Sequence, residues 1–129
     1  LNMVKTDEIY KCKLCGNIIS IIHAGGGTLS CCGSEMILLE EKSKEQEGNE
    51  KHVPVVEIKG NKVKVKVGEV EHPMEESHYI GLIQIARAGK VIGCKRLYPG
   101  EKPEAEFTIE NTEEITAREL CNIHGLWVS

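Results

Sequence analysis

Apolar and polar residues alternate along much of the chain after residue 52, a pattern typical of β-strands with one buried face. The stretch "VPVVEIKGNKVKVKVGEV" contains two such runs around Gly60-Asn61, which is a hairpin signal. In the second run Val63, Val65 and Val67 alternate with lysines. We therefore expect the valines to face a core and the lysines to face water.

Two more strand pairs are predicted further along the chain. "HYIGLIQIARAGKVIGCKRLY" indicates two strands around Ala88-Gly89, and "AEFTIENTEEITARELCNIHGLW" indicates a last pair around Asn111-Thr112. The segment "EEITAREL" has helix propensity, but its place between strand-like runs favours a strand. Turn signals at a spacing of roughly ten residues predict an antiparallel β-sandwich or barrel.

The first 39 residues have a different pattern. Two short apolar runs, at 18–22 and 36–39, flank the turn Gly25-Gly26-Gly27. This segment is too small to fold on apolar burial alone, and a bound metal would staple it. The polar stretch "EEKSKEQEGNEK" follows without periodicity, and we interpret it as a linker with little order of its own. The predicted division is a module at 1–39, a linker at 40–50 and a β domain at 51–129.

The composition narrows the function classes. Aromatic residues make up only 4% of the 129, so the core must rest on Val, Ile and Leu. A net charge of −4 argues against a nucleic-acid partner, and no apolar run approaches the roughly 20 residues of a membrane span. The start "LNMVKTDEIYKC" lacks the features of a signal peptide, so we expect the cytoplasm. In that reducing compartment the 6 cysteines indicate metal binding over disulfides.

Four cysteines of the first segment form a candidate metal site. Cys12 and Cys15 make a C-x-x-C pair, while Cys31 and Cys32 are adjacent, so that a single turn must present both of their sulfurs. Four thiolates are the usual ligands of a tetrahedral zinc or iron site, and the spacing alone leaves both metals open.

A second candidate site combines histidines with one cysteine after the linker. The motifs are "NEKHVPV", "EHPMEESHY" and "CNIHGLW", and their candidate ligands are His52, His72, His78, Cys121 and His124. Four imidazoles and one thiolate are one ligand too many for tetrahedral zinc, whereas imidazole suits iron. A square of nitrogens with sulfur on one side leaves the other side open, which favours a reaction site.

Both sets of motifs resemble known iron proteins. "YKCKLCGN…GGGTLSCCGSEM" resembles desulforedoxin, while "EKHVPV", "HPMEESHYI" and "CNIHGLW" resemble the mononuclear iron centre of superoxide reductase. Over nearly its whole length the chain is thus similar to the desulfoferrodoxin family. The resemblance implies an all-β fold, in which a small metal-stapled desulforedoxin-like module precedes an antiparallel immunoglobulin-like β-sandwich.

The resemblance also implies an activity, which is the one-electron reduction of superoxide to hydrogen peroxide without formation of dioxygen. Ferrous iron would act at the second site and be re-reduced by an external donor such as rubredoxin, in a homodimer. Two irons per chain are implied, with zinc possible in the first site.

Specific roles follow from the resemblance position by position. The implied ligands of the first iron are Cys12, Cys15, Cys31 and Cys32. The second iron would have His52, His72, His78 and His124 in its plane and Cys121 as axial thiolate. Glu50 and Lys51 match the pair beside the open position.

Three other residues near these motifs have ordinary interpretations. His23 is expected in a loop, Cys94 as a small buried hydrophobic residue, and Met74 in packing.

Two alternative functions stay open. A non-catalytic iron or copper electron-transfer protein is the first, although a blue-copper site would need two histidines and a Met after Cys121. A thiol enzyme with Cys121 as nucleophile and His124 as base is the second. It leaves three histidines unexplained.

Overall fold

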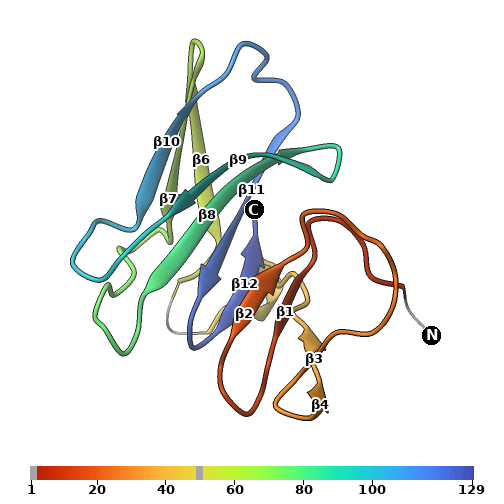
Figure 1. The fold of residues 1–129 in the computed structure, drawn as a ribbon. Coiled ribbons are helices and arrows are strands. Elements are labelled where there is room, and N and C mark those ends of the chain that lie inside the picture. The colour runs from red at the N-terminus through yellow and green to blue at the C-terminus, as the bar shows by residue number, and fades with distance from the viewer. Residues whose placement is uncertain (1–2, 49–50) are drawn as a thin grey trace. The chain divides into compact units, whose positions relative to one another are not determined.

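The computed structural model describes residues 3–48 and 51–129, and these divide into two compact units, Leu1–Glu40 and Glu41–Ser129. Strands dominate both units, as Figure 1 shows, and the sheets are antiparallel. The prediction of an all-β chain is therefore confirmed. Among the described residues, no helix has the length and apolar character needed to cross a membrane.

The first unit is built from very short strands. Its sheet has the order β2-β1-β5, with β1 at Ile9–Lys11, β2 at Ile18–Ser20 and β5 at Ile37–Leu38. A separate hairpin consists of β3 (Ser30–Cys31) and β4 (Ser34–Glu35). Buried apolar side chains in this unit include Ile9, Ile21 and Met36. So small an apolar cluster agrees with the expectation that the segment needs a metal as a staple.

One sheet of the second unit comes from the sequence around Gly60-Asn61. Strands β6 (Pro54–Lys59) and β7 (Lys62–Val67) form the predicted hairpin, and β10 (Glu104–Thr108) pairs with the other edge of β7. The predicted alternation is confirmed, because Val63, Val65 and Val67 are at most 1% exposed.

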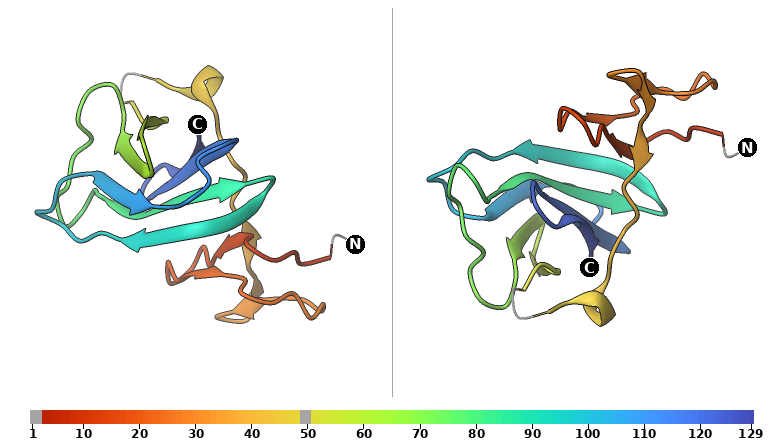
Figure 2. Two further views of the ribbon diagram at one scale, coloured as in Figure 1. Left: turned by 90° about the horizontal axis from the view of Figure 1, so that it is seen from above. Right: turned by 90° about the horizontal axis from the view of Figure 1, so that it is seen from below.

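The other sheet of this unit has the order β12-β11-β8-β9. Its strands are β8 (Ile80–Arg87), β9 (Lys90–Arg96), β11 (Ile115–Cys121) and β12 (Gly125–Val128). The two sheets form separate layers (Figures 1 and 2). Side chains of both layers meet in one core, in which Val65 lies with Ile83, Ile85 and Ala117.

The strand prediction around Asn111-Thr112 was wrong in its pairing. Strand β10 pairs with β7, whereas β11 pairs with β8 and β12, so the chain crosses from one sheet to the other at that point. The segment "EEITAREL" is a strand over most of its length, as predicted. Strand β12 was not predicted as a separate element, because the turn between Cys121 and Gly125 is only three residues long.

The polar segment before residue 49 has more structure than the expected linker. A 3₁₀ turn spans Lys44–Gln46, and the amide of Ser43 donates to the side chain of Gln46. The backbone of Lys42 bonds to β12. The residues that make these backbone hydrogen bonds show no apolar periodicity, so the sequence pattern does not reveal the bonds.

Gly68 follows β7 directly, at a close approach of two backbone segments. Its φ is +80°, and an added Cβ would lie 2.6 Å from the carbonyl oxygens of both Lys51 and Val70. Its own amide donates to the carbonyl of Val53. Gly89 has a similar φ of +77° but open space around it.

We predict that Gly68→Ala destabilises the protein more than Gly89→Ala. Both variants hold a side chain in the left-handed region, at a cost of about 1–2 kcal/mol. Only Gly68→Ala also forces backbone oxygens apart, which adds about 1–3 kcal/mol. Thermal unfolding of the two variants at equal metal content measures the difference. Equal melting temperatures would show that the contact with Lys51 is not tight.

Candidate metal centres

The four cysteine sulfurs of the first unit lie within 4.8 Å of one another. Cys12 follows β1 in a tight loop, in which its carbonyl accepts from the amide of Gly16 at 3.0 Å and its amide donates to Asn17 at 2.9 Å. The sulfurs of Cys15 and Cys31 are 3.5 Å apart. The structure thus brings together all four cysteines that the sequence singled out.

A two-residue turn presents the adjacent cysteines. Cys32 and Gly33 connect β3 to β4 with φ values of +54° and +75°, as in the hairpin turns that need two left-handed residues. The sulfurs of Cys31 and Cys32 are 3.9 Å apart, although they belong to consecutive residues. The strained conformation of Cys32 places its thiol with the other three.

The thiols of this cluster differ in acidity. The backbone amide of Cys15, which points at the sulfur, lowers the pKa of Cys12 to about 7, although burial opposes this. Hydrogen bonds to the sulfurs of Cys15 and Cys31 raise the pKa of Cys32 to about 12. Four neighbouring thiolates repel one another, so a cation among them is what allows all four to be ionised.

The second candidate site lies at one end of the sandwich, where several strands begin or end. His52 precedes β6, whose first residue pairs with the last residue of β7. His72 and His78 belong to the connection from β7 to β8. Cys121 ends β11, next to the start of β8, and His124 lies in the turn to β12. Antiparallel pairing therefore gathers residues that are up to 72 positions apart.

The four imidazoles form a closed cycle of ring contacts. Centroid distances are 4.8 Å from His52 to His72, 4.8 Å from His72 to His78, 5.1 Å from His78 to His124, and 4.8 Å from His124 back to His52. Neighbouring rings meet edge to face, at 61° to 81°. Ring nitrogens of His52, His72 and His78 lie within 4.8 Å of one another and of the Cys121 sulfur.

Hydrogen bonds orient individual ligand atoms. Nδ1 of His72 lies 2.8 Å from the carbonyl oxygen of Pro73, and because that oxygen only accepts, the proton is on Nδ1 and Nε2 keeps its lone pair. Nδ1 of His124 lies 3.1 Å from Nε2 of His52 and 3.8 Å from the Cys121 sulfur. The backbone amide of His124 donates to that sulfur at 3.3 Å.

The site is buried on one side and open on the other. His52 and His72 are each 3% exposed, and Cys121 is 1% exposed. His78 is half-buried, whereas His124 is exposed. The exposed His124 thus marks the solvent side of the site, while the Cys121 sulfur and Nε2 of both His72 and His78 are shielded from water.

Two residues that support the site were not found from the sequence. The side chain of Asn122 accepts from the amide of Tyr79 at 2.9 Å and donates to the carbonyl of Ser77 at 3.1 Å, which fixes the loop on both sides of His78. The position of Asn122 beside Cys121 was the only hint of a role in the site. Nothing in the sequence showed that its side-chain amide contacts a loop more than 40 residues away.

Glu47 is the second such residue. Its carboxylate accepts from the amides of His52 and Val53 at 2.9 and 3.0 Å. Burial alone would raise the pKa of Glu47, but these two donors, together with the charges of Lys51 and Lys44, lower it. The residue lies in the polar stretch assigned to the linker, where its charge gave no sign of this role.

Other predicted residues have separate outcomes. Lys51 is half-buried, with its backbone against Gly68, whereas Glu50 lies outside the described residues. His23 is exposed in a loop, and Met74 packs against the core, both as predicted. The prediction for Cys94 was wrong, because its side chain is exposed and accepts from Gln84 at 3.8 Å. Strand β9 is a sheet edge, so its outward face stays in water.

The donor sets fit the expected metals in chemical type and proximity. Four clustered thiolates suit iron or zinc. The imidazole cycle with one buried sulfur offers five donors, a set that suits a transition metal with one position left for a reactant.

Comparison with known proteins agrees with this arrangement. A desulfoferrodoxin homolog from Archaeoglobus fulgidus is 53% identical over 127 residues, which is 98% of this chain and 99% of that protein. The crystal structure of the superoxide reductase from Treponema pallidum matches with a TM-score of 0.71 at 27% identity, over 99% of this chain and 98% of that one. A superoxide reductase from Giardia intestinalis, described as 1Fe-SOR, is 36% identical, with a TM-score of 0.56 over 63% of this chain and 96% of its own.

Family models cover both units. The model of the desulfoferrodoxin N-terminal domain matches residues 4–39, and the model of desulfoferrodoxin itself matches residues 44–129. The chain therefore belongs to the desulfoferrodoxin family.

Proposed function

We propose that the chain is a superoxide reductase, which reduces superoxide to hydrogen peroxide by one electron at the second site. The observation that carries this proposal is the closed cycle of four imidazoles beside a buried cysteine sulfur. Similarity to solved superoxide reductases supports it. The residues that would hold iron there are His52, His72, His78, Cys121 and His124.

The chemistry divides between the metal and the protein. A ferrous ion would supply the electron, while two protons from solvent complete the conversion of superoxide to hydrogen peroxide. The four imidazoles would hold the metal, with the exposed His124 on the solvent side of the site. The thiolate of Cys121 would supply electron density to the metal, and the hydrogen bond that its sulfur accepts from the amide of His124 would moderate that donation.

Lys51 has a proposed role in attracting the substrate. Superoxide is an anion and the chain has a net charge of −4, so the overall field opposes their encounter. A lysine next to His52 supplies local positive charge where the substrate arrives. For Glu50, the proposed role beside the open position rests on the family resemblance alone.

The proposal also covers the cysteine cluster, the electron donor and the oligomeric state. The cysteine cluster would hold iron or zinc and mainly staple the first unit, since its ligands all come from that unit. A rubredoxin-like protein would return the electron from outside. We further propose that the chain works as a homodimer in the cytoplasm.

Cys121→Ser tests the ligand that sets this site apart. Replacing a soft thiolate by a hydroxyl should abolish the sulfur-to-iron charge-transfer band of the second site and reduce the second-order rate with superoxide by at least about 10²-fold. Stopped-flow absorbance of pre-reduced protein measures both. Cys31→Ser is the matched control, because it removes a thiol from the other site and should leave the band of the second site and the rate with superoxide intact.

The outcomes of this test separate the functions under discussion. A serine variant that kept the band and the rate would exclude Cys121 as the ligand. Wild-type protein with bound iron and the band, but without a superoxide reaction, would be an electron carrier.

Lys51→Ala tests the attraction of the substrate. Loss of this charge should slow the second-order reaction about tenfold, with unchanged iron content and spectrum. The wild-type rate should also fall as ionic strength rises, and the variant should lose part of that dependence. Lys59→Ala removes the same charge from the far end of β6 and should leave the rate unchanged. If both alanine variants reacted alike, net charge and not position would be responsible.

A further inference from the structure

Lys42 lies on the edge of β12, although it precedes the first strand of its unit by 12 residues. Its amide donates to the carbonyl of Leu126 at 2.9 Å, and its carbonyl accepts from the amide of Val128 at 2.8 Å. These two bonds bracket Trp127, the partner of Lys42 in an isolated parallel bridge. The backbone of Lys42 is thereby held beside the indole.

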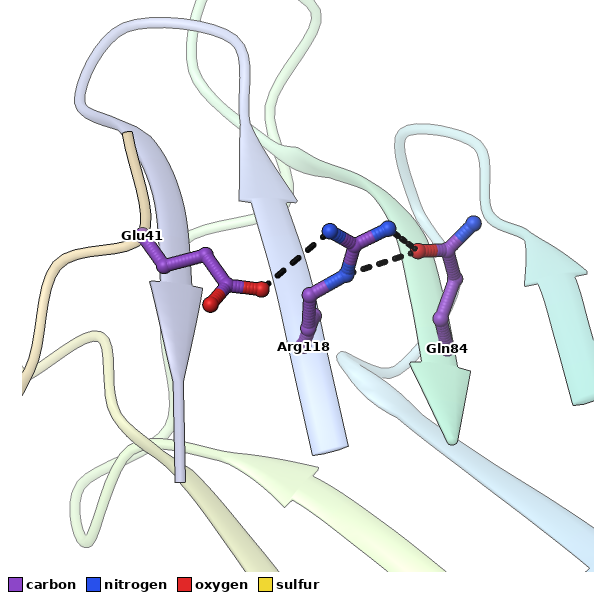
Figure 3. Close-up of polar contacts among 3 residues, drawn as sticks. All are labelled: Glu41, Gln84 and Arg118. Atoms are coloured by element: carbon purple, nitrogen blue, oxygen red, sulfur yellow. Dashed lines mark hydrogen bonds and ion pairs between the residues drawn. The ribbon is translucent and has the colours of Figure 1, made fainter. Parts of the chain in front are cut away.

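The neighbouring residue anchors the same segment (Figure 3). The carboxylate of Glu41 accepts from the guanidinium of Arg118 on β11 at 3.2 Å. Nε and a terminal nitrogen of Arg118 in turn donate to Oε1 of Gln84 on β8, at 3.1 and 2.6 Å. Arg118 and Gln84 are 8% and 5% exposed, so Glu41 binds to a buried and fully oriented group.

The side chain of Lys42 reaches the turn that carries His124. Its Nζ donates to the carbonyl oxygen of His124 at 3.1 Å, and Nε1 of Trp127 donates to the same oxygen at 3.1 Å. The amide of His124 donates to the Cys121 sulfur. His124 is thus held through its backbone on both sides of its imidazole.

Trp127 connects this arrangement to the buried side of the site. The indole is 4% exposed and stacks on the imidazole of His52, with centroids 4.7 Å apart and planes at 11°. The ammonium of Lys42 lies over the indole at 5.5 Å from its centroid, a favourable cation–π position. Lys42 therefore contacts groups that orient two imidazoles 72 positions apart in the sequence.

We propose that Lys42 is a positioning residue of the second site, which acts on His52 through Trp127 and on His124 through its carbonyl. Its positive charge has a second effect. A nearby cation disfavours the ferric state more than the ferrous state, so Lys42 raises the reduction potential of the site. The proposal rests on the proposed function only in requiring a redox-active metal at the second site.

Three substitutions in the iron-loaded full chain separate the charge from the hydrogen bond. Lys42→Met keeps the aliphatic stem but loses the charge and the hydrogen bond to His124. We expect a lower midpoint potential and a broadened ferric electron paramagnetic resonance signal for the iron of the second site. Lys42→Gln loses the charge but keeps a donor for the His124 carbonyl. The midpoint potential should therefore fall, while the electron paramagnetic resonance signal stays sharp. Lys42→Arg keeps charge and donor and should match wild type in both.

Lys62→Met is the matched control, since Lys62 pairs with Glu106 on the surface at 3.6 Å and begins β7, the strand whose other end lies at the site. It should change neither readout. Wild-type values in Lys42→Met, or an equal shift in Lys62→Met, would overturn the proposal. These readouts need no superoxide, so an inactive wild type with the predicted shifts would contradict the proposed function and leave the role of Lys42 standing.

Discussion

Mutual repulsion and desolvation of clustered metal ligands is the constraint on which the rest of this structure depends. Lone pairs of several imidazoles converge with the Cys121 sulfur, within 4.8 Å for three of the rings. Burying such groups together is unfavourable unless a cation lies among them and their outer atoms are hydrogen-bonded. The bond from His72 to Pro73 and the amide of His124 on the sulfur meet the second requirement. The cysteine cluster is under the same constraint, since hydrogen bonds to the neighbouring sulfurs of Cys15 and Cys31 raise the pKa of Cys32.

Antiparallel pairing is the means by which the fold meets this constraint. The start of β6 lies against the end of β7, and the start of β8 lies against the end of β11, so ligands from distant segments share one end of the sandwich. Residues outside the strands, together with Trp127 of β12, then orient the ligands. Glu47 holds the backbone at His52, Asn122 holds the loop of His78, and Lys42 with Trp127 holds His124. The rigid sheets thus give the site its place, and polar contacts from the loops give it its orientation.

The sequence predicted the metal ligands better than the residues that orient these ligands. Metal ligands belong to few residue types and their motifs are short, so the cysteines and histidines could be recognised directly. The valines of β7 revealed their buried face, because that strand lies between two others with one side on the core. The edge strand β9 gave no such signal, and Cys94 was placed on the wrong side. Glu47 acts through the backbone amides of His52 and Val53, and Lys42 through backbone groups of the remote strand β12; neither kind of contact has a periodicity to detect.

The fate of superoxide at the second site tests the central claim most directly. Reduction turns each superoxide into one hydrogen peroxide and yields no dioxygen, whereas dismutation of two superoxide ions yields one molecule of each. A single pulse of superoxide on fully reduced, iron-loaded protein, followed by peroxide and oxygen measurement, distinguishes the two. The account predicts peroxide equal to the superoxide consumed, matching oxidation of the second iron, and no dioxygen above the spontaneous background. Release of dioxygen in amounts equal to peroxide, with the iron still reduced, would contradict it.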